Sequence, residues 1–89
     1  QAIPGLIKLL EDEDSFVRYR AASALGEIKS EQAILGLINL LEDEDSSVRY
    51  RAASTLGQIK SEQAIPGLIN LLEDEKSSVR DSAASALGE

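Results

Sequence analysis

Tyrosine and arginine stand side by side at two corresponding places in the sequence, as Tyr19-Arg20 and Tyr50-Arg51. These two side-chain types are common at the energetic centres of protein interfaces, because each combines apolar area with a polar end. Phe16, the remaining aromatic residue, precedes the first pair closely. The combination favours recognition of another molecule. The alternative is that the phenol rings pack over their neighbours while the arginine stems cover alanines.

Aspartate and arginine recur in a second fixed pattern. The positions are Asp12, Asp43 and Asp74 for the aspartates, and Arg18, Arg49 and Arg80 for the arginines. Binding of an anionic ligand by the arginines is one interpretation. The interpretation that we favour is a structural ladder of Asp–Arg pairs between neighbouring copies of the pattern, because charge-assisted hydrogen bonds would fix how the copies pack.

Residues suited to catalysis are scarce. The chain has no His and no Cys, which excludes imidazole acid–base chemistry and thiolate nucleophiles. Its serines lack a base, its carboxylates lack an apolar pocket, and its glycines are isolated instead of forming a phosphate loop. We therefore expect a protein that is not an enzyme and that uses no cofactor.

Acidic runs occupy residues 11–14 and 42–45, and Lys76 replaces the fourth acid of a third run. These runs lack the ligand spacing and the distal Glu of a calcium loop. We expect them to be solvated turns whose charge complements the start of the following helix, and we expect no metal site.

The charge and hydropathy of the chain limit its partners. The net charge is −7, so a nucleic-acid backbone would be repelled and we expect no nucleic-acid partner. No apolar run approaches the length of a membrane span, and no secretory pattern is present, so we expect no membrane contact. These expectations together favour a cytoplasmic location.

The chain consists of nearly three copies of one sequence repeat. Residues 1–31 recur with five changes as residues 32–62, and recur again in a shorter form as residues 63–89. Such a period is typical of stacked repeats, in which each unit buries its apolar face against its neighbours. We expect a single repeat array over residues 1–89, and we expect this array to be a fragment of a longer one.

Each copy contains two segments with helical spacing. The apolar stripe of the first segment consists of Ile3, Leu6, Ile7 and Leu10, and that of the second consists of Val17, Ala21, Ala24, Leu25 and Ile28. Both stripes follow the three-to-four-residue period of one helix face. No segment alternates like a strand, so the predicted fold class is all-α.

Small polar residues and glycines mark the expected ends and crossings of these helices. Ser30 and Ser61 precede later copies of the first helix and are its expected N-caps. Gly26, Gly57 and Gly88 lie near the end of the second helix, where they suit a tight crossing or the start of a C-terminal turn.

The segment from Asp12 to Ile28 carries a family signature. Its pattern of Asp12, Val17-Arg18, Ala21-Ala22 and Ala24-Leu25-Gly26 resembles the short HEAT-like repeat named after phycobilisome lyases, and residues 43–59 and 74–88 follow the same pattern. The resemblance implies an α-solenoid, a right-handed superhelix of helix pairs whose second helices line a concave face. The family usually has Gly where Lys29 and Lys60 stand, so we expect the turn after the second helix to differ locally.

The resemblance also places the candidate binding residues on the concave face. They are Phe16, Tyr19, Arg20, Ser23, Ser47, Tyr50, Arg51, Ser54, Asp81 and Ser82. We expect a non-catalytic scaffold that binds a protein or peptide there, with the arginines paired to carboxylates of the partner. The alternative is an accessory role in bilin attachment, as in the lyase relatives, with Arg20 and Arg51 paired to bilin propionates. A structural spacer within a larger protein is a third interpretation.

The first and last copies lack polar caps, which would leave apolar side chains such as Ile3, Leu6 and Leu10 open at an end. We therefore expect end-to-end association of the chain.

Overall fold

The computed structural model describes residues 2–89 and places two helices in each repeat, as the apolar spacing predicts. The helices are α1 (Ala2–Leu9), α2 (Ser15–Ile28), α3 (Ile34–Asn39), α4 (Ser46–Ile59), α5 (Ile65–Leu71) and α6 (Ser77–Gly88). Short 3₁₀ turns flank α3 and precede α5, and their bounds are η1 (Glu31–Ala33), η2 (Leu40–Glu42) and η3 (Glu62–Ala64). Residues 2–89 contain no strand, which confirms the all-α fold class.

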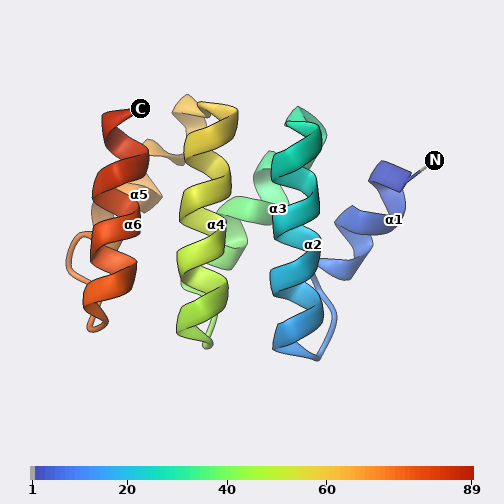
Figure 1. The fold of residues 1–89 in the computed structure, drawn as a ribbon, viewed down its shortest axis with the longest axis horizontal. Helices are drawn as coiled ribbons and strands as arrows, with labels where there is room; N and C mark the ends of the chain where they lie inside the picture. Colours follow the sequence, from blue (N-terminus) through green and yellow to red (C-terminus); the bar gives the residue numbers. More distant parts are fainter. Residues whose placement is uncertain (1) are drawn as a thin grey trace.

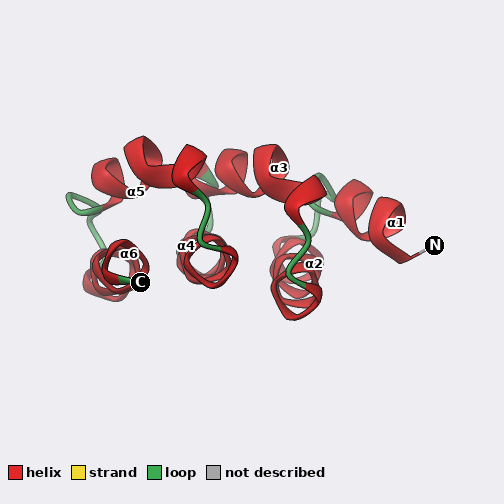
Figure 2. Ribbon diagram, turned by 90° about the horizontal axis from the view of Figure 1, so that it is seen from above, coloured by secondary structure: helices red, strands yellow, loops and turns green. Residues whose placement is uncertain are grey.

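The helices form two layers. In one layer α2, α4 and α6 lie side by side (Figure 1), and α1, α3 and α5 form the second layer (Figure 2). Each repeat thus contributes one helix to each layer, which is the arrangement of a solenoid. The long axis of the molecule, 35 Å in extent, runs across α2, α4 and α6 (Figure 1).

The core consists of leucine, valine and alanine side chains. Leu25, Leu37 and Leu56 are fully buried, as are Val48 and Val79. Buried alanines accompany them along the second helices, at positions Ala21, Ala22, Ala52, Ala53 and Ala83. A fully buried leucine contributes about 1.5–3 kcal/mol relative to an exposed one, so stability depends on contacts that only stacked repeats provide.

Gly26 and Gly57 allow the second helices to pack closely. A methyl group built on Gly26 would lie 2.7 Å from Gln58 Oε1, and one built on Gly57 would lie 2.9 Å from Ala86 Cα. Gln58 Oε1 is the end of a flexible side chain and can move, but a methyl group on Gly26 would also lie 3.0 Å from Cγ2 of the buried Thr55. Ala86 Cα belongs to the backbone and cannot move aside. The expected tight crossing is therefore confirmed at Gly26 and Gly57 but not at Gly88, where no described atom lies within 4 Å of an added methyl group.

Acidic turns start the second helices, as the sequence predicts. The carboxylate of Asp14 accepts the N–H of Phe16 at 2.9 Å, and that of Asp45 accepts the N–H of Ser47 at 2.8 Å. These are N-cap interactions, which satisfy amide donors that the helix itself leaves free. Lys76 occupies the same position before α6 and provides no side-chain cap.

The second helices end in a left-handed turn at a lysine. Lys29 and Lys60 have φ angles of 55° and 61°, a region that glycine enters at least cost. The N–H of Lys29 donates to the Gly26 carbonyl, and that of Ser30 donates to the Leu25 carbonyl, which is the hydrogen-bond pattern of a Schellman turn. The expectation of a locally different turn is therefore wrong, because lysine adopts the backbone conformation that glycine usually supplies.

Ser30 and Ser61 do not act as the side-chain caps that the sequence suggested. Both precede a 3₁₀ turn instead of an α-helix, and neither side chain forms a capping hydrogen bond. Their hydroxyl oxygens are buried without a hydrogen-bond partner in the described part of the chain. The turn carries the chain from one layer to the other before the helix begins at Ile34 or Ile65.

Across residues 2–89, no helix has both the length and the apolar character needed to cross a membrane.

Candidate interaction surface

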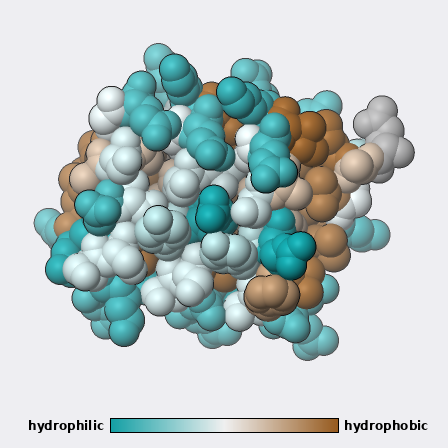
Figure 3. All heavy atoms as spheres, viewed as in Figure 1, coloured by the Kyte–Doolittle hydropathy of each residue, from teal (hydrophilic) through white to brown (hydrophobic). Residues whose placement is uncertain are grey.

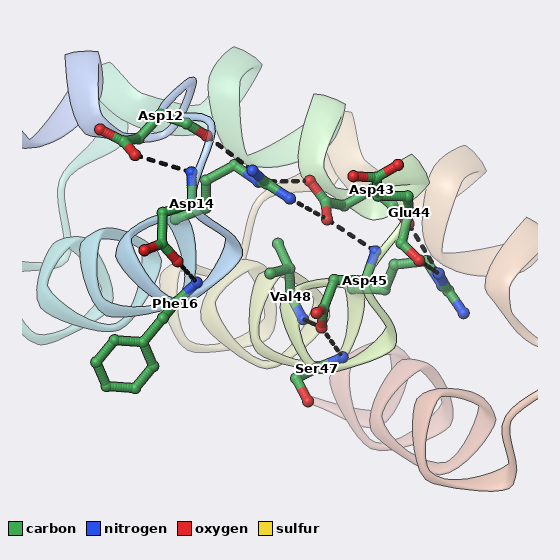
Figure 4. A network of polar contacts seen from close by, with 10 residues as sticks. Asp12, Asp14, Phe16, Asp43, Glu44, Asp45, Ser47 and Val48 are labelled. Carbon is green, nitrogen blue, oxygen red and sulfur yellow. Dashed lines mark hydrogen bonds and ion pairs between the residues drawn. The ribbon is translucent and has the colours of Figure 1, made fainter.

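A ladder of arginine–aspartate contacts joins neighbouring repeats (Figure 4). Arg18 Nε donates to Asp43 Oδ1 at 2.8 Å, and Arg18 Nη2 donates to Asp43 Oδ2 at 3.0 Å. Arg49 contacts Asp74 in the same way, at 2.9 and 3.2 Å. Each guanidinium plane thus meets a carboxylate through two parallel hydrogen bonds, which adds geometric specificity to the ion pair.

The same arginines hold the turns of their own repeats. Arg18 Nη1 donates to the Asp12 carbonyl at 2.7 Å, and Arg49 Nη1 donates to the Asp43 carbonyl at 2.8 Å. Asp43 Oδ2 also accepts the N–H of Asp45 at 2.9 Å (Figure 4). Each arginine therefore connects the acidic turns of two consecutive repeats, so these arginines and aspartates have a structural role.

Burial and hydrogen bonding oppose each other at the ladder. Burial raises the pKa of Asp74. Hydrogen bonds from Arg49 and from the Lys76 N–H, together with the charges of Arg49 and Arg80, lower this pKa by more than burial raises it. The pKa of Asp74 is therefore below its ordinary value. The hydrogen bond to Asp43 raises the pKa of Arg18 above its ordinary value in spite of burial. Both shifts favour the charged form, so the Arg18 guanidinium and the Asp74 carboxylate stay charged at neutral pH.

The ladder has one open group at each end of the described chain. Arg80 Nη1 donates to the Asp74 carbonyl, and Asp12 Oδ1 accepts the Asp14 N–H at 2.9 Å. Within residues 2–89, neither the Arg80 guanidinium nor the Asp12 carboxylate has an ion-pair partner.

Part of the expected binding surface is already engaged within the protein. Arg51 lies over the ring of Tyr19, 5.2 Å from its centroid, and Arg51 Nη2 donates to Tyr19 Oη at 3.1 Å. Both side chains are half-buried. This contact favours the alternative interpretation of packing over a neighbouring repeat for this pair.

Phe16, Arg20 and Tyr50 remain accessible in the α2–α4–α6 layer. Phe16 is 63% exposed, and Arg20 lies over its ring at 5.6 Å from the centroid. Tyr50 is 39% exposed. All three side chains are exposed, so a partner can contact them on the surface of this layer.

The remaining candidate residues divide between exposed and buried positions. Ser82 is buried, and its hydroxyl donates to the Tyr50 carbonyl at 2.9 Å, so its expected place on the binding surface is wrong. Asp81 and Ser47 are exposed, whereas the others are half-buried, at Ser23 and Ser54.

Two hollows lie between the second helices. The one between α2 and α4 has a volume of about 400 Å³ and is lined by Ser15, Phe16, Tyr19, Asp45 and Ser47. The other lies between α4 and α6, has a volume of about 90 Å³, and is lined in part by Tyr50, Asp81 and Glu89. The first hollow is therefore aromatic with one carboxylate, whereas two carboxylates line the second. The basic Arg20 lies on α2 beside Phe16. Shape, stacking and charge are the interactions that this surface offers.

Several contacts of this surface lay beyond the sequence analysis. Arg51 and Tyr19 are separated by one position more than a full repeat. Their contact could therefore have been predicted from the repeat period. The N-caps Asp14 and Asp45 could also have been found, because each precedes a helical stripe directly. Nothing in the sequence distinguished the buried Ser82 from its exposed neighbours.

Comparisons with known proteins agree with this geometry. Residues 1–36 and 34–89 match the model of HEAT repeats. None of the curated proteins compared with the chain matches it.

Two solved structures resemble this chain. One is the complex of CpcE and CpcF of phycocyanin lyase from Nostoc sp. PCC7120, with 38% identity and a TM-score of 0.86 over 92% of this chain and 34% of that chain. The other is an engineered protein, with 30% identity and a TM-score of 0.83 over 98% of this chain and 44% of that chain. The chain thus spans about a third of the lyase chain and less than half of the engineered one.

Proposed function

Because this chain belongs to the family of HEAT repeats, we propose that it is a non-catalytic scaffold that binds a protein or peptide on the α2–α4–α6 layer. Its likeness to the phycocyanin lyase structure confirms the resemblance to the short repeats of phycobilisome lyases and the solenoid fold. That neighbour is a complex of two proteins, which is consistent with a protein partner.

The observation that carries this proposal is the accessible aromatic area on the α2–α4–α6 layer. Phe16 and Tyr50 project from different helices of the same layer, and both are exposed. Tyr19, between them along the chain, is fixed by Arg51. A side chain that is already held by a neighbour, as Tyr19 is, loses less entropy when a partner binds against it.

The charges suggest the chemistry of the partner. Arg20 lies near the α2 end of the surface, whereas Asp81 and Glu89 line the hollow near α6. An extended peptide with carboxylates at one end and a lysine or arginine at the other would complement both regions. Charge complementarity of this kind orients a partner and sets specificity.

Peptides selected from a random display library against the wild-type chain would test this function. We expect the selected peptides to bind the double variant Phe16→Ala/Tyr50→Ala at least about tenfold more weakly, because aromatic anchors dominate such interfaces. The matched control is Leu35→Ala/Ile69→Ala, which removes comparable exposed side chains from the other layer.

Circular dichroism on all proteins would verify that the helices persist. Equal affinity of the selected peptides for the wild type and the Phe16→Ala/Tyr50→Ala variant would contradict the proposed surface.

A second candidate function is assistance in bilin attachment, which the likeness to the phycocyanin lyase structure favours. In this case Arg20 and Arg51 would pair with the propionates while the aromatic rings pack on the chromophore. Two observations weigh against it: Arg51 is already bonded to Tyr19, and the larger hollow includes the Asp45 carboxylate. A change in the visible absorbance of a bilin on mixing, abolished in Arg20→Ala, would support this candidate, and an unchanged spectrum would exclude it.

A further inference from the structure

Contacts between neighbouring repeats have a direction. The arginine of one repeat reaches forward to the aspartate of the next, as Arg18 does to Asp43. Arg51 reaches back to Tyr19 of the preceding repeat. Each repeat therefore has two different faces, and the face toward the following repeat complements the face toward the preceding one.

A leucine packs over a glycine at each of these boundaries. A methyl group on Gly36 would lie 2.9 Å from Leu10 Cδ1, and one on Gly67 would lie 2.7 Å from Leu41 Cδ1. Leu10 and Leu41 are accordingly only 3% and 2% exposed. Leu72, the corresponding leucine of the third repeat, is 40% exposed and has no such glycine against it.

The opposite face, on the first repeat, is open in the corresponding places. Leu9 is 39% exposed, whereas its counterparts Leu40 and Leu71 are each 6% exposed. No described atom lies within 4 Å of a methyl group built on Gly5. Leu9 and Val17 help to line a hollow of about 460 Å³ at this end. Figure 3 shows hydrophobic side chains, in brown, gathered on the right, the side on which Figure 1 places α1.

The charges of the two open faces are complementary. The third repeat presents Arg80, the counterpart of Arg18, and the first repeat presents Asp12, the counterpart of Asp43. Arg51 contacts Tyr19 of the preceding repeat. Arg20 is the counterpart of Arg51 in the first repeat, and Asp81 is the counterpart of Tyr19 in the third repeat. Both Arg20 and Asp81 are exposed.

We propose that a second copy of this chain docks head to tail on these faces, in the register that continues the repeats. Arg80 of one copy then pairs with Asp12 of the next, and Asp81 pairs with Arg20. Leu72 packs over Gly5 of the second copy in the way that Leu41 packs over Gly67. The contact is heterologous, because it joins two different faces, so it extends beyond two copies.

Apolar burial and local charge pairing must overcome the overall repulsion of two chains that each carry a net charge of −7. At about 0.15 M salt the Debye length is roughly 8 Å, so distant charges are largely screened while groups in contact are not. The repeat interface inside the chain consists of the same kinds of contact. The junction therefore continues an interface that the protein already forms, and it does not depend on the proposed peptide-binding function.

Charge reversal at one rung tests the register. We expect wild-type chain to grow in weight-average mass with concentration in sedimentation velocity at this ionic strength. Asp81→Arg alone and Arg20→Asp alone would each place like charges together and weaken association at least about tenfold. An equimolar mixture of the two variants would regain association, because each junction between two different variants joins opposite charges at this rung and the variants can alternate along the assembly.

Glu42→Arg is the matched control, since it changes the charge as Asp81→Arg does but lies on an exposed turn of the middle repeat. This variant should associate like the wild type. Wild-type chain that stays monomeric at all concentrations, or that stops at a dimer, would overturn the proposal. Failure of the mixture to regain association would overturn it as well.

Discussion

At the scale of single residues, the arginines of the ladder differ in the number of hydrogen bonds that they donate. Arg49 makes a bidentate pair with Asp74 and also donates to the Asp43 carbonyl, whereas Arg80 donates to the Asp74 carbonyl alone. The sequence predicted the Asp–Arg partners, because they recur unchanged with the period. The extra bond to the turn could not be predicted, since it depends on how the acidic turn folds.

Arg49→Ala should lower the free energy of unfolding by about 2–4 kcal/mol, because it leaves the partly buried Asp74 without its partner. Arg51→Ala should cost about 1 kcal/mol, the typical value of one hydrogen bond. Arg80→Ala, an exposed control in the same column, should cost less than about 1 kcal/mol. Urea unfolding measures all three, and equal midpoints for Arg49→Ala and Arg80→Ala would show that the rung contributes no stability.

Acid should weaken the protein through Asp74, whose pKa is lowered in the folded state by Arg49 after burial has raised it. A lowered pKa means that the unfolded chain binds protons more readily, so stability is full above the unfolded-state pKa of about 3.9 and falls as the pH drops below it. Asp74→Asn should be less stable at neutral pH but lose less stability between about pH 5 and pH 2.

The melting temperature of each protein across this pH range provides the test. Glu42→Gln, a change at an exposed carboxylate of the middle repeat, should give a curve parallel to that of the wild type. A curve for Asp74→Asn that also runs parallel would show that this carboxylate does not contribute to acid lability.

At the scale of the elements, helix α6 differs from α2 and α4 at its start. Asp14 and Asp45 cap the earlier helices, whereas Lys76 supplies no cap and places a positive charge beside the helix N-terminus. Lys76→Asp should therefore stabilise the protein by about 1 kcal/mol, as N-cap substitutions typically do.

Lys76→Glu separates the two possible causes, because it makes the same change of charge with a side chain that is a poor N-cap. A thermal unfolding experiment should show a smaller gain for Lys76→Glu than for Lys76→Asp. Similar gains would assign the effect to the helix dipole alone.

The helices themselves were predictable, whereas some of their ends were not. The spacing of residues such as Val17, Ala21 and Leu25 indicates a helix whatever surrounds it. The beginnings of α3 and α5 were missed, because a 3₁₀ turn with an uncapped Ser30 or Ser61 follows from the path between layers. Local helix propensity carries no information about the path of the chain from one layer to the other.

At the scale of the whole molecule, stability should be distributed unevenly along the array. The middle helix α4 packs against both α2 and α6, whereas α1 has no buried residue. Repeats that contact a neighbour on one side only open at lower cost than those enclosed on both sides. We expect hydrogen–deuterium exchange in dilute solution to be slowest in α4 and fastest in α1, and uniform protection of all helices would contradict this.

The candidate binding surface was predictable as a whole but not residue by residue. The period placed Phe16, Tyr50 and Arg20 on one layer correctly, because every copy folds alike. Burial of Ser82 and engagement of Tyr19 follow from the distance between adjacent second helices. That distance depends on the alanine and glycine packing of the whole stack.

The constant separation of the ladder partners also affects how a gene for such a chain can change. Arg18 and Asp43 are 25 residues apart, and so are Arg49 and Asp74. Insertion or loss of one full coding period leaves every arginine at the same separation from an aspartate, whereas an indel of another length within the array displaces the partners. Unequal recombination between the near-identical copies preserves this spacing. The number of repeats can therefore change during evolution while every Arg–Asp pair between neighbouring repeats is kept.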